Sequence, residues 1–123
     1  MSDTPSKSSS PDLASRPDLS GSQKKRFRQA AHHIDPVVTV GDQGLSDGVL
    51  AEAERALTDH ELIKVRLAGG DRAERTAQAQ AIATATQAQV VQQIGKVVVL
   101  YRHNKRAKAH LSNVSRLLGT PSS

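Results

Sequence analysis

The part of this chain whose residue types and spacing best suit a binding site is the tetrapeptide Gly41-Asp42-Gln43-Gly44. The β-branched run 37–40 precedes it, and Ser46 follows it at the expected start of a helix. Glycine permits positive φ and lets another backbone approach closely. The free N–H groups at the start of a helix favour an anion there. The pattern predicts a loop that holds a phosphate through its backbone, with an ordinary turn as the alternative.

Two clusters of positive charge lie on either side of this region. The first comprises Lys24, Lys25, Arg26 and Arg28, and the second comprises Lys96, Arg102, Lys105, Arg106, Lys108 and Arg116. Acidic residues outnumber basic ones between them, and the whole chain has a formal net charge of +5. Cations gathered on parts of a domain suit a polyanion such as nucleic acid. The alternative is that these ends are simply solvated.

Aromatic residues are scarce, which limits the kind of nucleic-acid contact to be expected. The chain has one Phe, one Tyr and no Trp. Tyr101 ends the last expected strand, where it can stack on an exposed base or pack half-buried against the protein. Wide stacking platforms for single strands are not expected. Recognition of structured RNA by shape and phosphates is favoured instead.

Several classes of function are excluded or disfavoured. The chain lacks cysteine, so it has no disulfide, thiol nucleophile or Cys-ligated metal. His32 and His33 are adjacent and do not form the i, i+4 pair of a helical metal site. The sequence contains neither a G-x-S-x-G elbow nor a Walker-type phosphate loop. We expect no catalysis, metal, cofactor or small-molecule substrate.

No apolar stretch approaches the roughly 18 residues of a membrane span, and the N-terminus lacks the apolar core of a secretory signal. We expect a cytoplasmic monomer without a membrane partner.

Hydrophobic periodicity predicts the elements that must position these residues. Helices are expected over 23–33, 46–59 and 71–85, and strands over 37–40, 61–67, 88–94 and 97–102. Ser46 and Asp71 are placed to cap the second and third helices. The order αβαβαββ predicts a single α/β (α+β) domain with three helices packed on a four-stranded mixed sheet.

The same patterns predict which residues are buried. One face of the first helix carries Phe27, Ala30, Ala31 and Ile34, with the cations on the other face. The second helix is expected to bury Val49, Leu50, Ala53 and Leu57, and the alanine-rich third helix Ala77, Ala81 and Ile82. In the second strand, Leu62 and Ile63 are expected inside.

Composition divides the chain into three parts. Residues 1–22 are rich in Ser, Pro and Asp and are expected to form a disordered tail. Residues 23–103 form the domain, and residues 104–123 form a basic extension. Helix-like spacing over 111–118 predicts a short helix that docks on the domain, on a partner or on nothing. The basic residues of the extension form either a mobile arm that reaches along RNA or a solvated tail.

Residues 24–102 resemble the YhbY-type CRM (chloroplast RNA splicing and ribosome maturation) domain. The resemblance lies in three stretches in the family's order, KKRFRQAAHHIDPVVTVGDQGLSDGVLAE, ALTDHELIKVRL and VVQQIGKVVVLYR. It implies a fold similar to the C-terminal domain of bacterial translation initiation factor three. It also implies association with precursors of the large ribosomal subunit, as in single-domain bacterial members, or with group II introns, as in plant organelle members.

The resemblance suggests which residues contact RNA. The family's G-x-x-G loop maps onto residues 41–44, and its basic first helix maps onto Lys24, Lys25, Arg26 and Arg28, followed by His32. Asp42 departs from the family, whose loops commonly carry a basic residue there, and its charge would repel a phosphate. With Tyr101 and Arg102 added, these residues predict binding to ribosomal RNA of the large-subunit precursor. Other structured RNA, such as an intron or small RNA, and a protein-docking adaptor are the alternatives.

Overall fold

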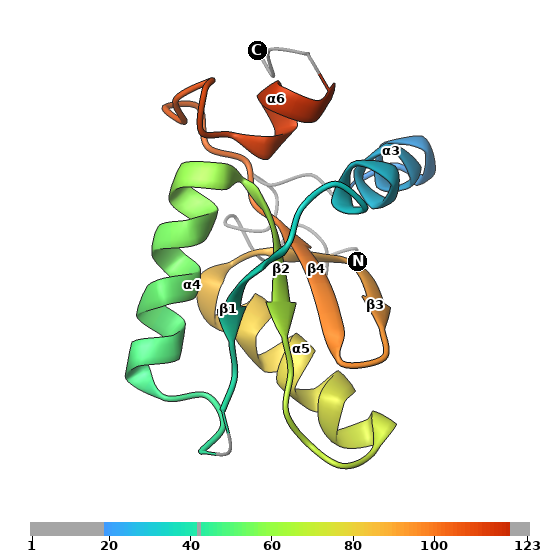
Figure 1. The fold of residues 1–123 in the computed structure, drawn as a ribbon, viewed down its shortest axis with the longest axis vertical. Helices are drawn as coiled ribbons and strands as arrows, with labels where there is room; N and C mark the ends of the chain where they lie inside the picture. The colour runs from blue at the N-terminus through green and yellow to red at the C-terminus, as the bar shows by residue number, and fades with distance from the viewer. Residues whose placement is uncertain (1–18, 42, 119–123) are drawn as a thin grey trace, which may run out of the picture.

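The computed structural model describes residues 19–41 and 43–118. A four-stranded sheet has helices on both faces (Figure 1). In chain order the elements are α3 (Gly21–Ala31), β1 (Pro36–Thr39), α4 (Asp47–His60), β2 (Leu62–Arg66), α5 (Arg72–Thr86), β3 (Gln89–Ile94), β4 (Val97–Tyr101) and α6 (Asn113–Leu118). The predicted αβαβαββ order is confirmed, and α6 lies in the segment for which a short helix was predicted.

The sheet is mixed, as predicted, with the strand order β1-β2-β4-β3. Strands β1 and β2 are parallel, and α4 forms the crossover between them. Strand β4 is antiparallel to both of its neighbours, β2 and β3. The predicted hairpin of β3 and β4 turns at Gly95, whose φ of +56° suits a tight hairpin turn.

Side chains cap the helices where the sequence predicted caps. Ser46 Oγ accepts a hydrogen bond from Val49 N at 3.2 Å, and Asp71 accepts one from Glu74 N at 2.8 Å. Helix α3 begins two residues earlier than predicted, because Ser20 and Gln23 form a reciprocal capping box.

Residues 19–22, which were assigned to the tail, are therefore part of the described fold. The remaining tail residues, 1–18, and the last residues of the extension, 119–123, lie outside the described residues.

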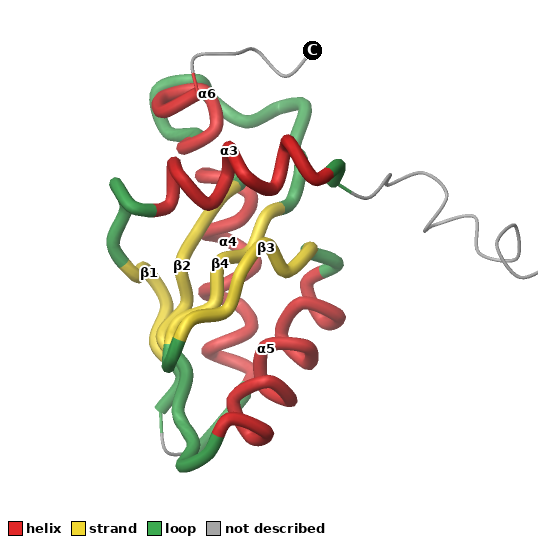
Figure 2. The backbone as a smooth tube through the Cα atoms, turned by 90° about the vertical axis from the view of Figure 1, so that its right-hand side faces the viewer, coloured by secondary structure: helices red, strands yellow, loops and turns green. Residues whose placement is uncertain are grey.

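The larger core lies between the sheet and the helices α4 and α5, which cover the same face (Figure 2). It consists of Val38, Val40, Ala53, Leu57, Ile63, Val65, Leu67, Ala79, Ile82, Ala83, Val98 and Leu100. The predicted face of α4 is confirmed, since Ala53 and Leu57 are fully buried and Val49 and Leu50 pack beside them.

The predicted face of α5 is wrong in part. Ala77 and Ala81 are exposed, whereas Ala79, Ala83 and Thr86 are buried beside Ile82. An alanine-rich helix offers several nearly equivalent apolar stripes, so the sheet decides which of them is buried.

A second core lies on the opposite face of the sheet, beneath α3 and α6. It consists of Phe27, Ala30, Ala31, Leu62, Val91, Val99 and Val114. These two helices cover one end of this face, as Figure 2 shows. At this end of the sheet, the side chains that alternate along the central strands are therefore buried on both faces. At the other end they are buried only on the face beneath α4 and α5.

The C-terminal extension docks on the domain through Glu61, which is 2% exposed. Its carboxylate accepts hydrogen bonds from Ser112 Oγ and Asn104 N, both at 2.7 Å. Asn113 Nδ2 donates to Leu62 O at 2.7 Å. Of the three alternatives for the short helix, docking on the domain is the one observed.

The segment that carries the basic residues of the extension is not a free arm. Lys105, Arg106 and Lys108 are exposed. Asn104 Nδ2 donates to Thr58 O on one side of them, and Leu111 O lies 2.8 Å from His60 Nδ1 on the other. Both ends of this segment are held against the end of α4.

Candidate nucleic-acid interface

Beyond α3 and α6, one face of the sheet is left open. Strand pairing places Lys64, Val99 and Gln92 in one row across this face and Thr39, Arg66, Val97 and Ile94 in the next. Because side chains alternate along a strand, both rows point away from the core beneath α4 and α5. Val99 is buried in the second core, and we call the other six residues the open sheet face.

Two cations, Lys64 and Arg66, stand on the open sheet face. Lys64 is half-buried and Arg66 is exposed. Within the described parts of the chain, neither side chain makes an ion pair or a hydrogen bond. Their charges are therefore available to a ligand.

Sequence reasoning missed both cations, although a signal was present. In residues 63–67 every second residue is apolar and the two cations occupy the positions between. This period of two puts the cations on the face opposite the core.

The sequence predicted that the cations of α3 share the face opposite its apolar residues. The structure shows that they do not lie on one side of the helix. The buried residues Phe27, Ala30 and Ala31 define the inward face. At 3.6 residues per turn, Lys24 and Arg28 flank this face on one side and Arg26 flanks it on the other. Lys25 points directly outward.

The C-terminal end of α3 meets the open sheet face at a hollow of about 220 Å³. It is lined by Arg28, Ala31, His32, Lys64, Gln92, Ile94, Val97 and Val99. The structure thus brings two predicted residues, Arg28 and His32, beside the unpredicted Lys64. No acidic side chain lines this hollow, as far as the described residues go.

The glycine loop lies at the other end of β1 (Figure 1). Gly44 N donates to Gly41 O at 2.9 Å, and Gly44 adopts a φ of +76°. A Cβ built on either glycine meets no atom within 4 Å, so the loop has open space around it. Gln43 is exposed, whereas Asp42 lies outside the described residues.

The open sheet face joins the two predicted elements. The five residue steps from Pro36 to Gly41 span roughly 16 Å along an extended strand. Val40 N donates to Arg66 O at 2.8 Å, so the end of β2 lies beside the start of the loop. Helix α3, the two cations and the glycine loop therefore follow one another along the molecule.

Tyr101 packs against the protein, the second of its two predicted alternatives. Its ring centroid lies 4.6 Å from that of Phe27, with the planes tilted by 39°. Burial, with a contribution from the Glu61 carboxylate, raises the pKa of Tyr101 to about 12. Stacking on a base stays a prediction, and one face of this ring is already in contact with Phe27.

We expect the free energy of unfolding to depend on the ionisation of Tyr101 at high pH. In the unfolded chain the phenol ionises near its ordinary pKa of 10.0, whereas the folded protein keeps the proton until about pH 12. Its contribution to stability is therefore complete below pH 10 and is lost as the pH rises to about 12. Absorbance titration of the chain's one tyrosine, native and in denaturant, measures both values. The Tyr101→Phe variant should lack this pH-dependent loss, and a native midpoint near 10 would contradict the expectation.

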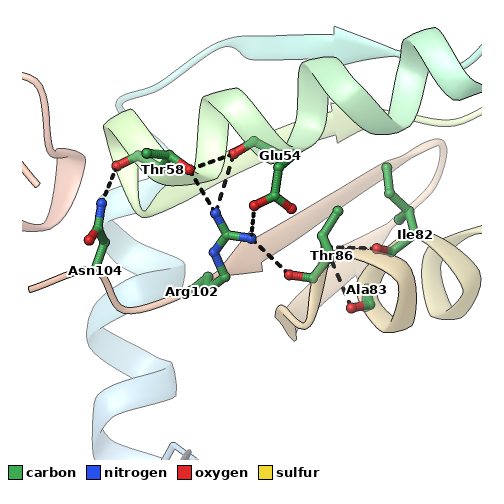
Figure 3. A network of polar contacts seen from close by, with 7 residues as sticks. All are labelled: Glu54, Thr58, Ile82, Ala83, Thr86, Arg102 and Asn104. Atoms are coloured by element: carbon green, nitrogen blue, oxygen red, sulfur yellow. Dashed lines mark hydrogen bonds and ion pairs between the residues drawn. The ribbon is translucent and has the colours of Figure 1, made fainter.

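Arg102 makes structural contacts within the protein, and its RNA contact stays a prediction (Figure 3). Its guanidinium donates to Thr86 O and Thr58 Oγ1, both at 2.9 Å, and to Glu54 O at 3.3 Å. It also forms an ion pair with the Glu54 carboxylate at 2.8 Å. These contacts join β4 to α4 and to the end of α5, and they leave little of the charge for a ligand.

Across residues 19–41 and 43–118, no three His, Asp or Glu side chains lie close enough to hold a metal ion. Over the same residues, no helix is long and apolar enough to cross a bilayer.

The fold and this surface define a small α/β binding domain with an open, cationic sheet face beside a basic helix. The model of the CRS1 / YhbY (CRM) domain family matches residues 19–102, and the chain belongs to this family.

Curated relatives are similar over nearly their whole length. The probable RNA-binding protein PA4753 of Pseudomonas aeruginosa is 46% identical over 101 residues, which are 82% of this chain and 97% of the relative. An RNA-binding protein of Haemophilus influenzae is 50% identical over 93 residues, 76% of this chain and 94% of that one. The solution structure of SAV1595 from Staphylococcus aureus matches with a TM-score of 0.66 and 33% identity, over 74% of this chain and 95% of that protein. The predicted fold class is therefore confirmed.

Proposed function

We propose that this protein binds RNA, and that its target is ribosomal RNA of the large-subunit precursor, whose assembly it assists in the cytoplasm. The observation that carries the proposal is a cationic surface that runs from Arg28 of the basic helix, over Lys64 and Arg66 of β2, toward the glycine loop. The names of the relatives support RNA as the ligand. The family resemblance supports the ribosomal target.

Binding would use the charges of the surface and the backbone of the loop. Lysine and arginine neutralise phosphates and release counterions, which makes affinity fall as salt rises. Backbone N–H groups at the glycine loop can hold a phosphate without reading the base sequence. The protein would then recognise the shape and backbone of a folded RNA.

Sedimentation of a native lysate through sucrose gradients tests the ribosomal target. We expect the protein to migrate with large-subunit precursors at low salt and to be released at high salt. A protein that stays at the top of the gradient under both conditions would exclude this target. Nuclease treatment of a pull-down then separates the remaining alternatives, because a protein-docked adaptor keeps its partner and an intron or small-RNA binder loses it.

Two charge-matched double variants test the direction of the cations on α3. Lys24→Ala with Arg28→Ala removes the pair on one flank, and Lys25→Ala with Arg26→Ala removes the same charge elsewhere on the helix. Each lost phosphate contact should flatten the slope of log K against log salt by about 0.7–0.9. We expect the first variant to lose about 1.5 units of slope and the second about half as much. Equal losses would show that the helix acts as a diffuse charge.

The glycine loop can be tested without unfolding the domain. Gly41 lacks a positive φ and has open space around it, so Gly41→Glu should change the free energy of unfolding by about 0.5 kcal/mol or less. If the loop holds a phosphate, the same variant should lower RNA affinity about tenfold or more through repulsion. Chemical denaturation and a filter-binding assay measure the two effects. Gly44→Ala is a stability control, because the φ of +76° at Gly44 should cost about 1 kcal/mol.

A Gly41→Glu protein that is stable and binds RNA normally would place the contact elsewhere. One that unfolds would show that the loop is structural.

A further inference from the structure

The hollow between α3 and the open sheet face is lined by both apolar and polar side chains. Its apolar lining consists of Ala31, Ile94, Val97 and Val99, of which Ile94 is exposed. Its polar lining consists of Arg28, His32, Lys64 and Gln92. Contact with phosphates alone would not favour an apolar lining, because phosphate groups are charged and strongly hydrated.

The size and charge of the hollow limit what can enter it. Its volume of about 220 Å³ is below the roughly 300–1,000 Å³ of pockets for drug-sized ligands. It therefore suits one small group. Among the described residues the lining holds Arg28 and Lys64 and no carboxylate, which favours a group that is attached to an anion.

Gln92 faces this hollow because of an irregularity in the edge strand. The pairing of β3 with β4 shifts between Val90 and Gln92, so Gln92 pairs with Val99 while Val91 packs in the second core. Such a shift redirects side chains locally. Within the described residues the Gln92 side chain makes no hydrogen bond, so its amide can donate and accept toward a ligand.

We propose that the hollow is a subsite for a single unpaired nucleotide of the bound RNA. The base lies on Val97 and Ile94, and Gln92 bonds its polar edge. Arg28 and Lys64 hold the adjoining phosphate, and the planes of Arg28 and His32 are of the kind on which splayed-out bases stack. The inference rests on the proposed RNA binding and adds that this protein prefers RNA with an unpaired base.

Two RNA hairpins of the same stem sequence provide the test. One carries a single bulged 2-aminopurine, and the other is fully paired. We expect the bulged hairpin to bind about tenfold more tightly, because it alone offers an unpaired base to the hollow. Gln92→Glu should bring the two affinities to within about twofold, because it replaces the amide donor with a charge that repels the phosphate.

Gln80→Glu is the charge-matched control, because Gln80 is exposed on α5, which covers the opposite face of the sheet. It should keep the preference for the bulge.

The outcomes separate this proposal from the broader one. Equal, salt-dependent binding of both hairpins by the unaltered protein would overturn the subsite and leave the proposed RNA binding intact. Binding of neither hairpin would overturn both.

A measurement on the unaltered protein keeps the proposal testable if Gln92→Glu does not fold. Adenosine monophosphate should shift the methyl NMR signals of Ile94 and Val97 beyond the shifts caused by ribose 5-phosphate. Identical shifts from the two compounds would overturn the base contact.

Discussion

Reversing the charges of Lys64 and Arg66 together, in the Lys64→Glu, Arg66→Glu variant, is expected to lower RNA affinity about 100-fold or more at low salt. Both cations lie on the open sheet face with no partner among the described residues. Hydrogen bonds to charged groups are worth about 1.5–3 kcal/mol each, and 1.4 kcal/mol is about tenfold in affinity. Fluorescence anisotropy with a labelled ribosomal RNA fragment at two salt concentrations measures the loss.

The control for this variant carries the same change in net charge on the other side of the molecule. Arg55→Glu with Arg72→Glu alters exposed residues of α4 and α5, which cover the opposite face of the sheet. We expect a loss of about tenfold or less, arising from long-range electrostatics alone. If the two double variants lose the same affinity, the open sheet face is not the RNA surface.

Replacing Arg102 with alanine is expected to lower the free energy of unfolding by about 2–4 kcal/mol while leaving the RNA affinity of the folded protein unchanged. The side chain is 16% exposed and bonds to Thr86 O, Thr58 Oγ1 and two groups of Glu54. Its loss leaves the carbonyl of Thr86, a residue that is 3% exposed, without its charged donor, and an unsatisfied buried acceptor is costly. Urea denaturation measures the change.

Glu54→Gln separates the ion pair from the rest of the network. The Glu54 side chain is 55% exposed, so loss of its charge alone should cost about 0.5 kcal/mol. A small loss for Arg102→Ala, together with weakened RNA binding, would return Arg102 to the RNA surface.

The order of elements could be predicted from the sequence because each element carries its own local signal. Ser46 and Asp71 precede apolar periodicity at the helical spacing, and their capping bonds are observed. The run over 97–101 is uniformly apolar and so does not show which core each residue joins. That assignment depends on α3, which reaches β2 and β3 from a distant part of the chain.

The candidate site was predicted in part. The basic helix and the glycine loop are contiguous in sequence, so their residues could be recognised without the fold. Lys64 and Arg66 belong to a strand whose alternation was present but not used. The structural contacts of Arg102 could not be predicted, because an arginine beside a basic segment gives no sign of its partners, and Glu54 and Thr86 lie 48 and 16 residues away.

By itself, the sequence determined what depends on near neighbours along the chain: the helices and strands, their order, their caps and the two cationic segments. Only the tertiary structure decided which cations are free and which are used. The pairing of β2 with β1 and β4 leaves Lys64 and Arg66 on an uncovered face, while the packing of α4 against α5 surrounds Arg102 with acceptors. The physical reason is that a charge binds a ligand or stabilises the fold according to what lies within hydrogen-bonding distance, and those neighbours are brought together by folding.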